Sequence, residues 1–473
     1  VVRQSACPLW CHVYDVDEAD EGAGNTPPPH CRNNNQIRKR VARAYILWKL
    51  HNKPKTGIRV IAGGTQISTT AVSQTLSRAL KLIIGECNGI FTEMFLRLGY
   101  VRPCPIVQST DEIIKHLRYI NRLCSHGHFP LDKGKVVSFD FTKLCPLLPS
   151  DAVVTNVSTI VALGFHRRRE NRARRSDSTS SIFIKQECYP SKERAEWVDE
   201  EPTDPEELEG FIFLYVDTIV EHVRFIMDNA YSTFADGLFR QTIGVPTGTN
   251  CAPEIANIFL FYYELEFFQQ KLSAWNVLSK PMQCVLLSYM RYIDDIFSAT
   301  SDASMIFEGS GGFMFGDSAQ GTGIFPTAVK KADGSIIEKP LELEGEGGSS
   351  VNYLDVTISI RRNRLRWTLY DKKKFIFIDG KALSESPNFP WYDSKLTERS
   401  KVGVVTSEMV RYSRRTDTET DFIAHTMALI KKMVKFGYEK RKVMRKVQNF
   451  RHFPRNLGRW SRTRRRIMDT FND

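Results

Sequence analysis

The sequence predicts an α+β protein in which short strands and long helices are mixed along the chain. Residues 136–141 (Val-Val-Ser-Phe-Asp-Phe) alternate with period two, as a half-buried strand does. Residues 68–84 and 396–450 instead carry apolar side chains at helical spacing. Loops rich in Gly and Pro separate these segments, which indicates several packed elements of both kinds.

Composition narrows the function classes. Of the 473 residues, 42% are hydrophobic and 11% aromatic, enough for about two to four domains or subdomains. Lys and Arg (66) outnumber Asp and Glu (54), and the net charge of +12 favours a polyanionic partner such as nucleic acid. No apolar run reaches the ~18 residues that span a bilayer, and no signal-peptide pattern opens the chain. We therefore expect no membrane partner and an intracellular, nuclear location.

The ten cysteines are scattered through a long chain, so we expect reduced thiols rather than a disulfide framework. The first residue is Val1 rather than Met, and we expect the sequence to be a fragment. Residues 1–40 are rich in Pro, Gly, Asn and charge and predict a poorly ordered segment. Cysteines and histidines in this segment fit no closed zinc site that we would assign.

Residues 45–54 and 56–62 predict two strands joined by a turn, with Lys49, Lys53 and Arg59 available to contact phosphates or to form a solvated hairpin face. A Ser/Thr cluster at 68–70 then begins an amphipathic helix that reaches about residue 84.

Asp140 is an acid in the apolar strand 136–141, which makes it a candidate metal ligand, although a single strand Asp is more often a surface residue. After it, residues 166–209 begin with arginines and end with an acidic, Pro-containing stretch. We expect a charged, largely disordered insertion there.

A helical pattern at 211–231 precedes the Gly/Pro-rich loop 241–253, which enters a helix expected at 254–272. Gly244 and Gly248 let the backbone approach a ligand closely, and Pro253 suits the first turn of a helix. Taken alone, this is a turn before a buried helix. It is also suited to lie beneath the base and sugar of a nucleotide.

Asp294 and Asp295 are adjacent acids between two β-prone segments, 285–293 and 296–300, which predicts a hairpin with both carboxylates at its tip. Neighbouring like charges repel, and apolar surroundings add a desolvation cost. A divalent cation would remove both penalties, whereas a solvated Asp turn is the simpler alternative.

Residues 353–360 and 364–371 predict paired strands, and 396–450 predicts helices with apolar stripes. Between Lys431 and Arg466 the sequence holds fifteen Lys or Arg and one acid, Glu439. Such a basic helical surface suits the backbone of an RNA–DNA duplex, although a charge run is also compatible with a merely solvated face.

The acid-ended strand, the Gly-Pro loop with its helix and the double-Asp hairpin, in this order, resemble the palm of reverse transcriptases. Closer similarity is to retroelement enzymes of the Penelope-like kind. Three further motifs support it: Lys49-Leu-His-Asn-Lys-Pro54, Ile61-Ala-Gly-Gly-Thr-Gln-Ile-Ser-Thr-Thr70 and Tyr353-Leu-Asp355. The resemblance spans roughly residues 44 to 440 and implies a right-hand polymerase fold with fingers, palm and helical thumb.

The resemblance implies an RNA-directed DNA polymerase that uses two Mg²⁺ ions, or Mn²⁺ in their place, with an RNA template, a DNA primer, an RNA–DNA duplex and dNTPs as partners. Asp140, Asp294 and Asp295 would be catalytic and hold the metal. The implied nucleotide contacts are Lys49, Arg59, Phe141, Cys145, Gly244, Pro246, Thr247, Gly248, Lys330 and Lys331. The implied nucleic-acid contacts are Lys431, Lys432, Lys435, Lys440, Arg441, Lys442, Arg445 and Lys446.

The chain departs from the family at two positions. Cys145 stands where many reverse transcriptases place a bulky aromatic that excludes the ribose 2′ hydroxyl, so we expect weaker discrimination against ribonucleotides. Thr247 stands where Gln or Met is frequent. These departures and the charged insertion suggest one alternative, a catalytically weak or inactive nucleic-acid-binding remnant of a retroelement. A telomerase-like enzyme is a second alternative, because the palm motifs do not distinguish it. Nothing in the sequence resembles the GIY-YIG nuclease of some relatives, so we expect no DNA cleavage.

The expected domain organisation follows from the resemblance and the composition. It comprises a poorly ordered segment at 1–40, fingers at 41–135, the first palm segment at 136–165, the charged insertion at 166–209, fingers and palm at 210–360, and a primer-grip-like hairpin with the basic thumb at 361–473.

Overall fold

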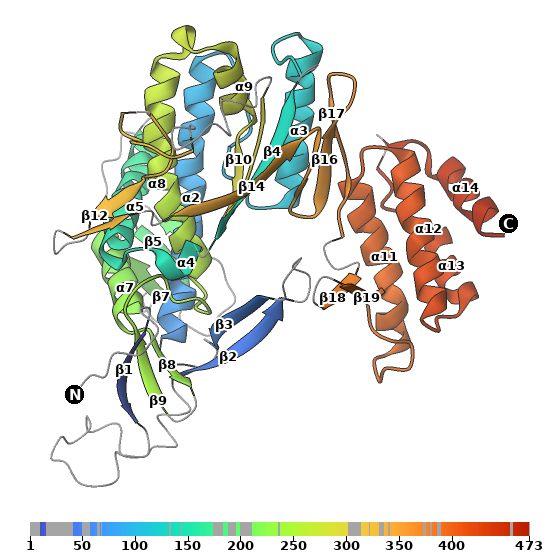
Figure 1. Ribbon diagram of the computed structural model, residues 1–473, viewed down its shortest axis with the longest axis horizontal. Coiled ribbons are helices and arrows are strands. Elements are labelled where there is room, and N and C mark those ends of the chain that lie inside the picture. The colour runs from blue at the N-terminus through green and yellow to red at the C-terminus, as the bar shows by residue number, and fades with distance from the viewer. Residues whose placement is uncertain are drawn as a thin grey trace.

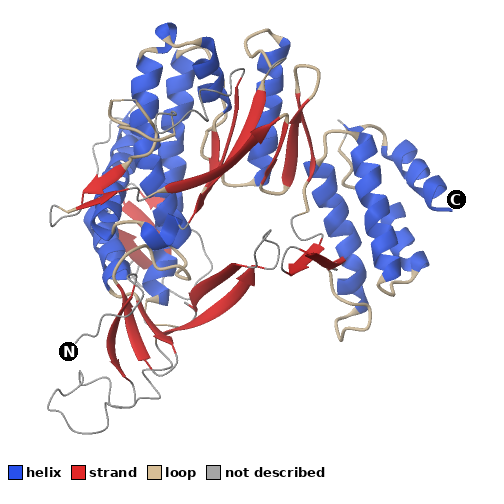
Figure 2. Ribbon diagram, in the orientation of Figure 1, coloured by secondary structure: helices blue, strands red, loops and turns tan. Residues whose placement is uncertain are grey.

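The computed structural model confirms the mixed α+β class (Figures 1 and 2). It describes residues 10–15, 41–49, 57–63, 67, 69–131, 134–142, 144–173, 183–187, 195–198, 211–234, 237–300, 314–320, 322–330, 335–338, 341–371, 375–378, 381–385, 389–454 and 457–472. None of the helices in these ranges is long and apolar enough to cross a membrane.

Long helices form one side of the larger part of the molecule, where α2, α5, α7 and α8 pack against one another (Figure 1). Their bounds are α2 Thr70–Arg97, α5 Ser150–Ala173, α7 Val216–Asp228 and α8 Ala252–Ser273. The expected apolar face of α2 is confirmed, because Leu76, Leu80 and Ile83 are fully buried. The helix extends beyond residue 84 because Cys87, Phe91 and Phe95 continue the same buried face.

The central sheet has the strand order β10-β11-β4-β14 and is antiparallel throughout. Its strands are β4 Lys135–Thr142, β10 Met290–Tyr292, β11 Asp295–Thr300 and β14 Glu342–Gly348. Gly345 lies opposite Phe139, and a Cβ at this glycine would stand 2.2 Å from the Phe139 ring. The aromatic ring therefore covers a strand position that only glycine can occupy without displacing it.

A second antiparallel sheet, β15-β16-β17, lies beside the central one (Figure 1). Its strands are β15 Ser350–Tyr353, β16 Val356–Ile360 and β17 Leu365–Leu369. The Tyr353 ring lies 5.6 Å from that of Phe297 in β11, so this sheet covers one face of the central strands. Val136 and Ser138 are buried for this reason, although they share the strand face of Asp140.

Three further helices complete the larger part: α3 Thr110–Ser125, α4 Leu144–Leu147 and α9 Lys280–Ser288. A 3₁₀ turn, η2 Trp275–Val277, precedes α9. The remaining sheets are β1-β9-β8-β2-β3, β6-β5-β7, β12-β13 and β18-β19. Their strands are β1 Trp10–Asp15, β2 Ala42–Lys49, β3 Gly57–Gly63, β5 Phe183–Glu187, β6 Glu196–Val198, β7 Phe211–Leu214, β8 Tyr231–Phe234, β9 Gly237–Gln241, β12 Ala328–Lys330, β13 Ile336–Glu338, β18 Phe375–Ile378 and β19 Lys381–Glu385.

The C-terminal helices have a core of their own. They are α11 Glu398–Arg415, α12 Glu419–Lys435, α13 Lys440–Gln448 and α14 Trp460–Asn472. Met409, Ile423, Met427 and Ile430 are buried in this core as their stripes predicted, but Val434, at the C-terminal end of α12, is 38% exposed. A separate and larger core joins the remaining helices to the central sheet, β15-β16-β17 and β6-β5-β7.

The paired strands expected near residues 45–62 are confirmed as the antiparallel pair β2–β3, and the helix expected after Pro253 is confirmed as α8. The expected strand from 285 is wrong over its first part, because 285–288 close α9. Ser279 Oγ accepts from Met282 N (3.4 Å) at the start of that helix, and five consecutive buried residues lie at its end. Burial overrides the β preference of Val285.

Four further expectations need correction. Residues 166–173 continue α5, and β5 and β6 lie within the stretch expected to be disordered. Residues 211–214 are strand β7, which pairs with β5, so the helix begins only at Val216. Leu354 has a φ of 51°, which divides the expected strand 353–360 into β15 and β16. Within residues 1–40, β1 pairs with β9. Pairing with β9 decides the outcome for residues 10–15, and pairing with β5 decides it for residues 211–214.

Candidate active site

The acids singled out by the sequence meet at one end of the central sheet. Asp295 is the direct cross-strand partner of Asp140, and Asp294 lies in the turn between β10 and β11. Residues directly opposite in an antiparallel ladder project to the same face with Cβ atoms ~5 Å apart. The sheet therefore brings Asp140 and Asp295 together although 155 positions separate them in the sequence.

Glu344 adds a fourth acid that sequence reasoning missed. It lies opposite Asp140 on the other side of β4, so Asp295, Asp140 and Glu344 form a row across three strands. Asp140 and Glu344 are exposed, and Asp294 and Asp295 are half-buried. The acidic residues of 342–346 were a sequence signal for a further acid near the site, but only the strand register places Glu344 in this row.

The turn that carries Asp294 is held by backbone hydrogen bonds. Phe141 N donates to Asp294 O at 3.2 Å, which ties the turn to β4. Ile293 has a φ of 52°, a conformation that a β-branched residue adopts only when its surroundings enforce it. Arg291 Nη1 provides that constraint by donating to Ile293 O at 2.9 Å.

Arg291 is fully buried and belongs to an ion pair inside the protein. Its Nε and Nη2 donate to the two carboxylate oxygens of Glu264 at 2.7 and 2.6 Å, and its Nη1 donates to Asn257 Oδ1 at 2.7 Å. Burial lowers the pKa of the guanidinium, but the Glu264 carboxylate more than offsets this and the net pKa is raised. Since Glu264 and Asn257 lie on α8, this helix fixes the acid-bearing turn.

Tyr353 supports the same acids from the second sheet. Its hydroxyl donates to Asp295 O at 3.3 Å, and its side chain is fully buried. Burial and then the negative charge of Asp295 raise the pKa of this hydroxyl well above its usual value. Tyr353 therefore stays protonated and remains a donor to the backbone of the acid row.

The Gly-Pro loop is anchored to α4, next to Cys145. Val245 N donates to Cys145 O at 2.7 Å, and Gly244 N donates to Leu148 O at 3.0 Å. Gly244 has a φ of +91°, and a Cβ there would stand 2.4 Å from Pro146 O. Only glycine allows this approach, which joins the loop to the segment that follows Asp140.

The other end of the loop is held by α2. Ser73 Oγ accepts from Asn250 N at 2.7 Å and from Cys251 N at 3.3 Å, so it caps the start of α8. Beside this end lies a cavity of about 20 Å³ whose lining includes Thr247 and Gly248 together with Ala42 and Ala62 of the β2–β3 hairpin. The loop, α2 and the base of the hairpin thus meet.

The remaining predicted nucleotide contacts are placed unevenly. Gly248 is exposed, Thr247 and Cys145 are half-buried and Pro246 is buried. Phe141 is only 4% exposed and packs edge-on against Phe325 at 5.0 Å, which leaves its ring little surface for a nucleotide. The side chains of Lys49, Arg59 and Lys330, and all of Lys331, lie outside the described residues, so their predicted roles stay predictions.

The predicted nucleic-acid contacts lie on α12 and α13. Lys431, Lys435, Lys440, Arg441 and Arg445 are exposed, whereas Lys432 and Lys446 are half-buried. Lys442 differs from these, because its Nζ lies 2.8 Å from Glu398 and 2.5 Å from Glu439. These hydrogen bonds raise the pKa of Lys442, and its charge is already compensated within the protein.

The acids suit a divalent ion by the chemistry of their donors, since carboxylate oxygens are the hard ligands that Mg²⁺ prefers. In the described part of the chain, however, no three His, Cys, Asp or Glu side chains are gathered as a ready-made metal site. A metal here would therefore be held by few protein ligands and by substrate phosphates, as is common for Mg²⁺.

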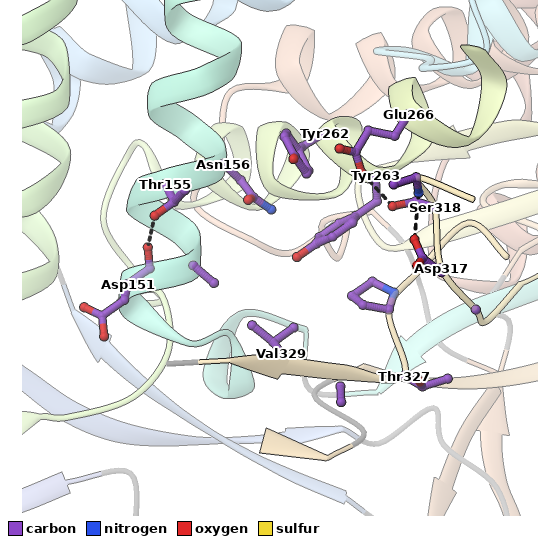
Figure 3. A pocket seen from close by; sticks show the side chains of 15 residues that line it. Asp151, Thr155, Asn156, Tyr262, Tyr263, Glu266, Asp317, Ser318, Thr327 and Val329 are labelled. Carbon is purple, nitrogen blue, oxygen red and sulfur yellow. Dashed lines mark hydrogen bonds between the residues drawn. The ribbon is translucent and has the colours of Figure 1, made fainter. Parts of the chain in front are cut away.

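A hollow of greater volume than the cavity beside the loop lies elsewhere. It has a volume of about 790 Å³ and lies between α5, α8 and residues 316–329, with Asp151, Asn156, Tyr263 and Glu266 in its wall (Figure 3). Ser318 Oγ donates to Glu266 Oε2 at 2.7 Å across one side of it. None of the predicted acids lines this hollow, so it is separate from the acid row.

Comparisons with known proteins give distant structural resemblances. No protein-family profile and no curated protein matches the chain. Telomerase from Candida albicans in complex with the TWJ fragment of telomeric RNA is similar with a TM-score of 0.49 at 10% identity, over 88% of this chain and 58% of that chain. Apo telomerase from Candida tropicalis is similar with a TM-score of 0.40 at 12% identity, over 89% and 62%.

The Candida tropicalis telomerase with the same RNA fragment gives a TM-score of 0.38 at 12% identity, over 90% of this chain and 60% of that chain. This chain therefore spans less than two thirds of the telomerase chains it resembles. Identities of 10–12% with TM-scores below 0.5 mark a distant resemblance and assign no function to this chain.

Proposed function

We propose that this chain is a template-directed nucleic-acid polymerase, specifically an RNA-directed DNA polymerase of a Penelope-like retroelement, with the right-hand arrangement of fingers, palm and thumb. The observation that carries the proposal is the pairing of Asp295 with Asp140, with Asp294 in the adjoining turn. Acids from two distant parts of the chain meet, and the segment that follows Asp140 is bonded to a Gly-Pro loop suited to close approach of a nucleotide.

The reaction joins the 3′ oxygen of a primer to the α-phosphorus of a nucleoside triphosphate, while the bond to pyrophosphate breaks and the hydroxyl proton leaves. Negative charge develops on the phosphate oxygens, so the site must position two oxygens and neutralise that charge. Mg²⁺, or Mn²⁺ in its place, held by Asp140, Asp294 and Asp295 would supply the positive charge.

The chain's own residues contribute rigidity and orientation. Arg291 and Tyr353 hold the carbonyls of Ile293 and Asp295, so the backbone on both sides of Asp294 is fixed before substrate binds. Cys145 and the loop from Gly244 share backbone bonds, which places the position that would face the sugar next to the loop that would face the base. Such positioning reduces the entropy lost on the way to the transition state.

Primer extension on an RNA template with Mg²⁺ tests the proposal. We expect Asp294→Asn to lower the extension rate at least about 100-fold, because a carboxylate that neutralises transition-state charge is lost. Asp228→Asn is the matched control, since Asp228 is an exposed acid at the end of α7, and it should extend like wild type. Duplex binding without extension by the wild type would instead identify a nucleic-acid-binding remnant.

A further inference from the structure

The loop before α11 carries an exposed indole. Trp391 is 59% exposed, whereas Trp275 and Trp367 are each 7% exposed. Leaving so large an apolar ring exposed to water is costly relative to burying it, which makes Trp391 a candidate contact for a binding partner. Trp391 also lies away from the acid row, because it precedes the end of α11 opposite to the one that contacts Asp355.

Trp391 is held rigidly on its inner side. Its ring contacts that of Phe436 edge-on at 4.8 Å, and Phe436 in turn contacts Phe389 at 5.9 Å. Tyr438 packs against Phe389 at 5.6 Å and donates its hydroxyl to Pro390 O at 2.6 Å, which fixes the residue just before Trp391. The indole is therefore oriented before any partner binds, and little side-chain entropy remains to be lost.

The charges around this indole favour a polyanion. Lys432 Nζ lies 5.8 Å from the Phe389 ring, whereas Lys401 is 9% exposed and donates its ammonium to Tyr392 O, which braces the backbone beside Trp391. The carboxylates of Glu398 and Glu439 are both occupied by Lys442. Asp393 is the nearby exposed acid. Lys432 therefore lies next to the aromatic cluster that holds Trp391, and a cation near a fixed, exposed aromatic ring is the combination that single-stranded nucleic-acid sites use.

Trp391 lies far from the acids along α11. Arg415, at the C-terminal end of this helix, contacts Asp355 next to the second sheet, whereas Trp391 precedes the N-terminal end. The 18 residues of α11 correspond to about 27 Å of helix. A base bound at Trp391 is therefore outside the site where synthesis would occur.

We infer that Trp391 is a stacking site for an unpaired nucleobase, which binds a single-stranded stretch of template or primer beyond the duplex. This inference rests on the proposed function for the identity of the nucleic acid. The chemistry is aromatic stacking of a base on the open face of the indole, with the sugar-phosphate backbone near Lys432. Every base offers such a face, so the site should tolerate any sequence.

The test compares Kd values of the full chain for a fluorescein-labelled 12-mer of thymidine and for an abasic 12-mer with the same backbone. We expect Trp391→Ala to weaken thymidine binding about 10-fold and to leave abasic binding unchanged. Trp391→Phe should restore most of the affinity because it keeps an aromatic ring. Phe225→Ala, which removes an exposed aromatic on α7, is the matched control and should bind like wild type.

A second readout does not depend on the alanine variant. Thymidine 12-mer should quench intrinsic tryptophan fluorescence in the wild type, and Trp391→Phe should remove most of that quenching. Equal losses for the thymidine and abasic strands, or unchanged binding in Trp391→Ala, would overturn the inference. Primer extension is measured separately. Trp391-dependent binding without extension refutes the polymerase and keeps the stacking site. Extension with binding that does not depend on Trp391 refutes the stacking site and keeps the polymerase.

Discussion

Individual buried side chains position the acids that face solvent. Arg291 fixes the carbonyl of Ile293, and Tyr353 fixes that of Asp295, so the conformation of the acidic turn depends on residues that would touch neither metal nor nucleotide. Cys145 has a comparable double role. Its carbonyl anchors the Gly-Pro loop, while its half-buried side chain occupies the position that the family resemblance assigns to sugar selection.

At Cys145 we predict that a larger side chain raises selectivity for deoxynucleotides. Cys145→Phe should increase the ratio of dNTP to rNTP incorporation by at least about 10-fold, because the ring would meet the 2′ hydroxyl. Single-nucleotide incorporation kinetics with paired substrates measure this ratio. Cys145→Ser, which preserves the volume, should leave it near the wild-type value, and an unchanged ratio in Cys145→Phe would contradict the assignment.

His116 provides a pH-dependent contribution to stability. Burial, and then the nearby Arg102 charge, lower the pKa of this histidine to about 3. The bond of its Nε2 to Cys104 O (2.5 Å) acts in the opposite direction but is the smaller effect. Below the unfolded pKa of about 6.5 the unfolded chain takes up a proton that the folded chain refuses. Stability from this group is therefore present above about pH 6.5 and is lost as the pH falls.

We predict that His116→Gln flattens this dependence. The free energy of unfolding of the wild type should fall by up to about 1.4 kcal/mol per pH unit more steeply than that of the variant between pH 6 and pH 4. Urea unfolding at several pH values measures both slopes. Parallel slopes would show that His116 does not set the acid sensitivity.

At the scale of elements, α8 contacts the site both at its N-terminus and along its length. Its N-terminus continues the Gly-Pro loop and is capped by Ser73, while Asn257 and Glu264 along its length hold Arg291 of β10. The helix thus couples the loop to the acidic turn. Breaking a buried ion pair at one partner leaves an uncompensated charge and costs more than removing both partners.

Glu264→Gln should therefore lower the free energy of unfolding by about 3–5 kcal/mol, because the Arg291 charge stays buried without its counterion. The combined replacement Glu264→Leu and Arg291→Met should cost less than this single change. Glu408→Gln is the control, because Glu408 pairs with Arg411 within α11 and both side chains keep contact with solvent, so a change within about 1 kcal/mol is expected there. Denaturant unfolding measures all three, and equal costs for Glu264→Gln and Glu408→Gln would refute the coupling.

For the whole molecule, two cores are joined by an ion cluster. Arg415 of α11 contacts Asp111 at 2.6 Å and Asp355 at 3.1 Å, and its hydrogen bond lowers the pKa of Asp111. Asp355 belongs to the Tyr353-Leu-Asp355 motif, so one short turn holds both the acid row and the helical group. The basic surface of α12 and α13 is carried by that helical group.

Salt dependence of RNA–DNA duplex binding tests this basic surface. Neutralising Lys440 and Arg445 together to Gln should reduce the slope of log K against log salt by about 2, since each phosphate contact contributes about 0.9. Lys442→Gln is an internal control. Its slope change should be less than about half of that expected for Lys440 or Arg445 alone, because Glu398 and Glu439 already compensate the charge of Lys442. Equal effects at all three positions would contradict this distinction.

The sequence by itself determined the mixed α+β class, the β2–β3 hairpin, α8 and the identity of the candidate acids, because local periodicity and turn chemistry encode these features. It could not determine Glu344, Arg291 or the strand β7, since each depends on partners distant along the chain. Strand register and burial are properties of the packed molecule. Only the tertiary structure therefore decided that Asp140 and Asp295 are neighbours, that Lys442 is already paired, and that Trp391 faces outward.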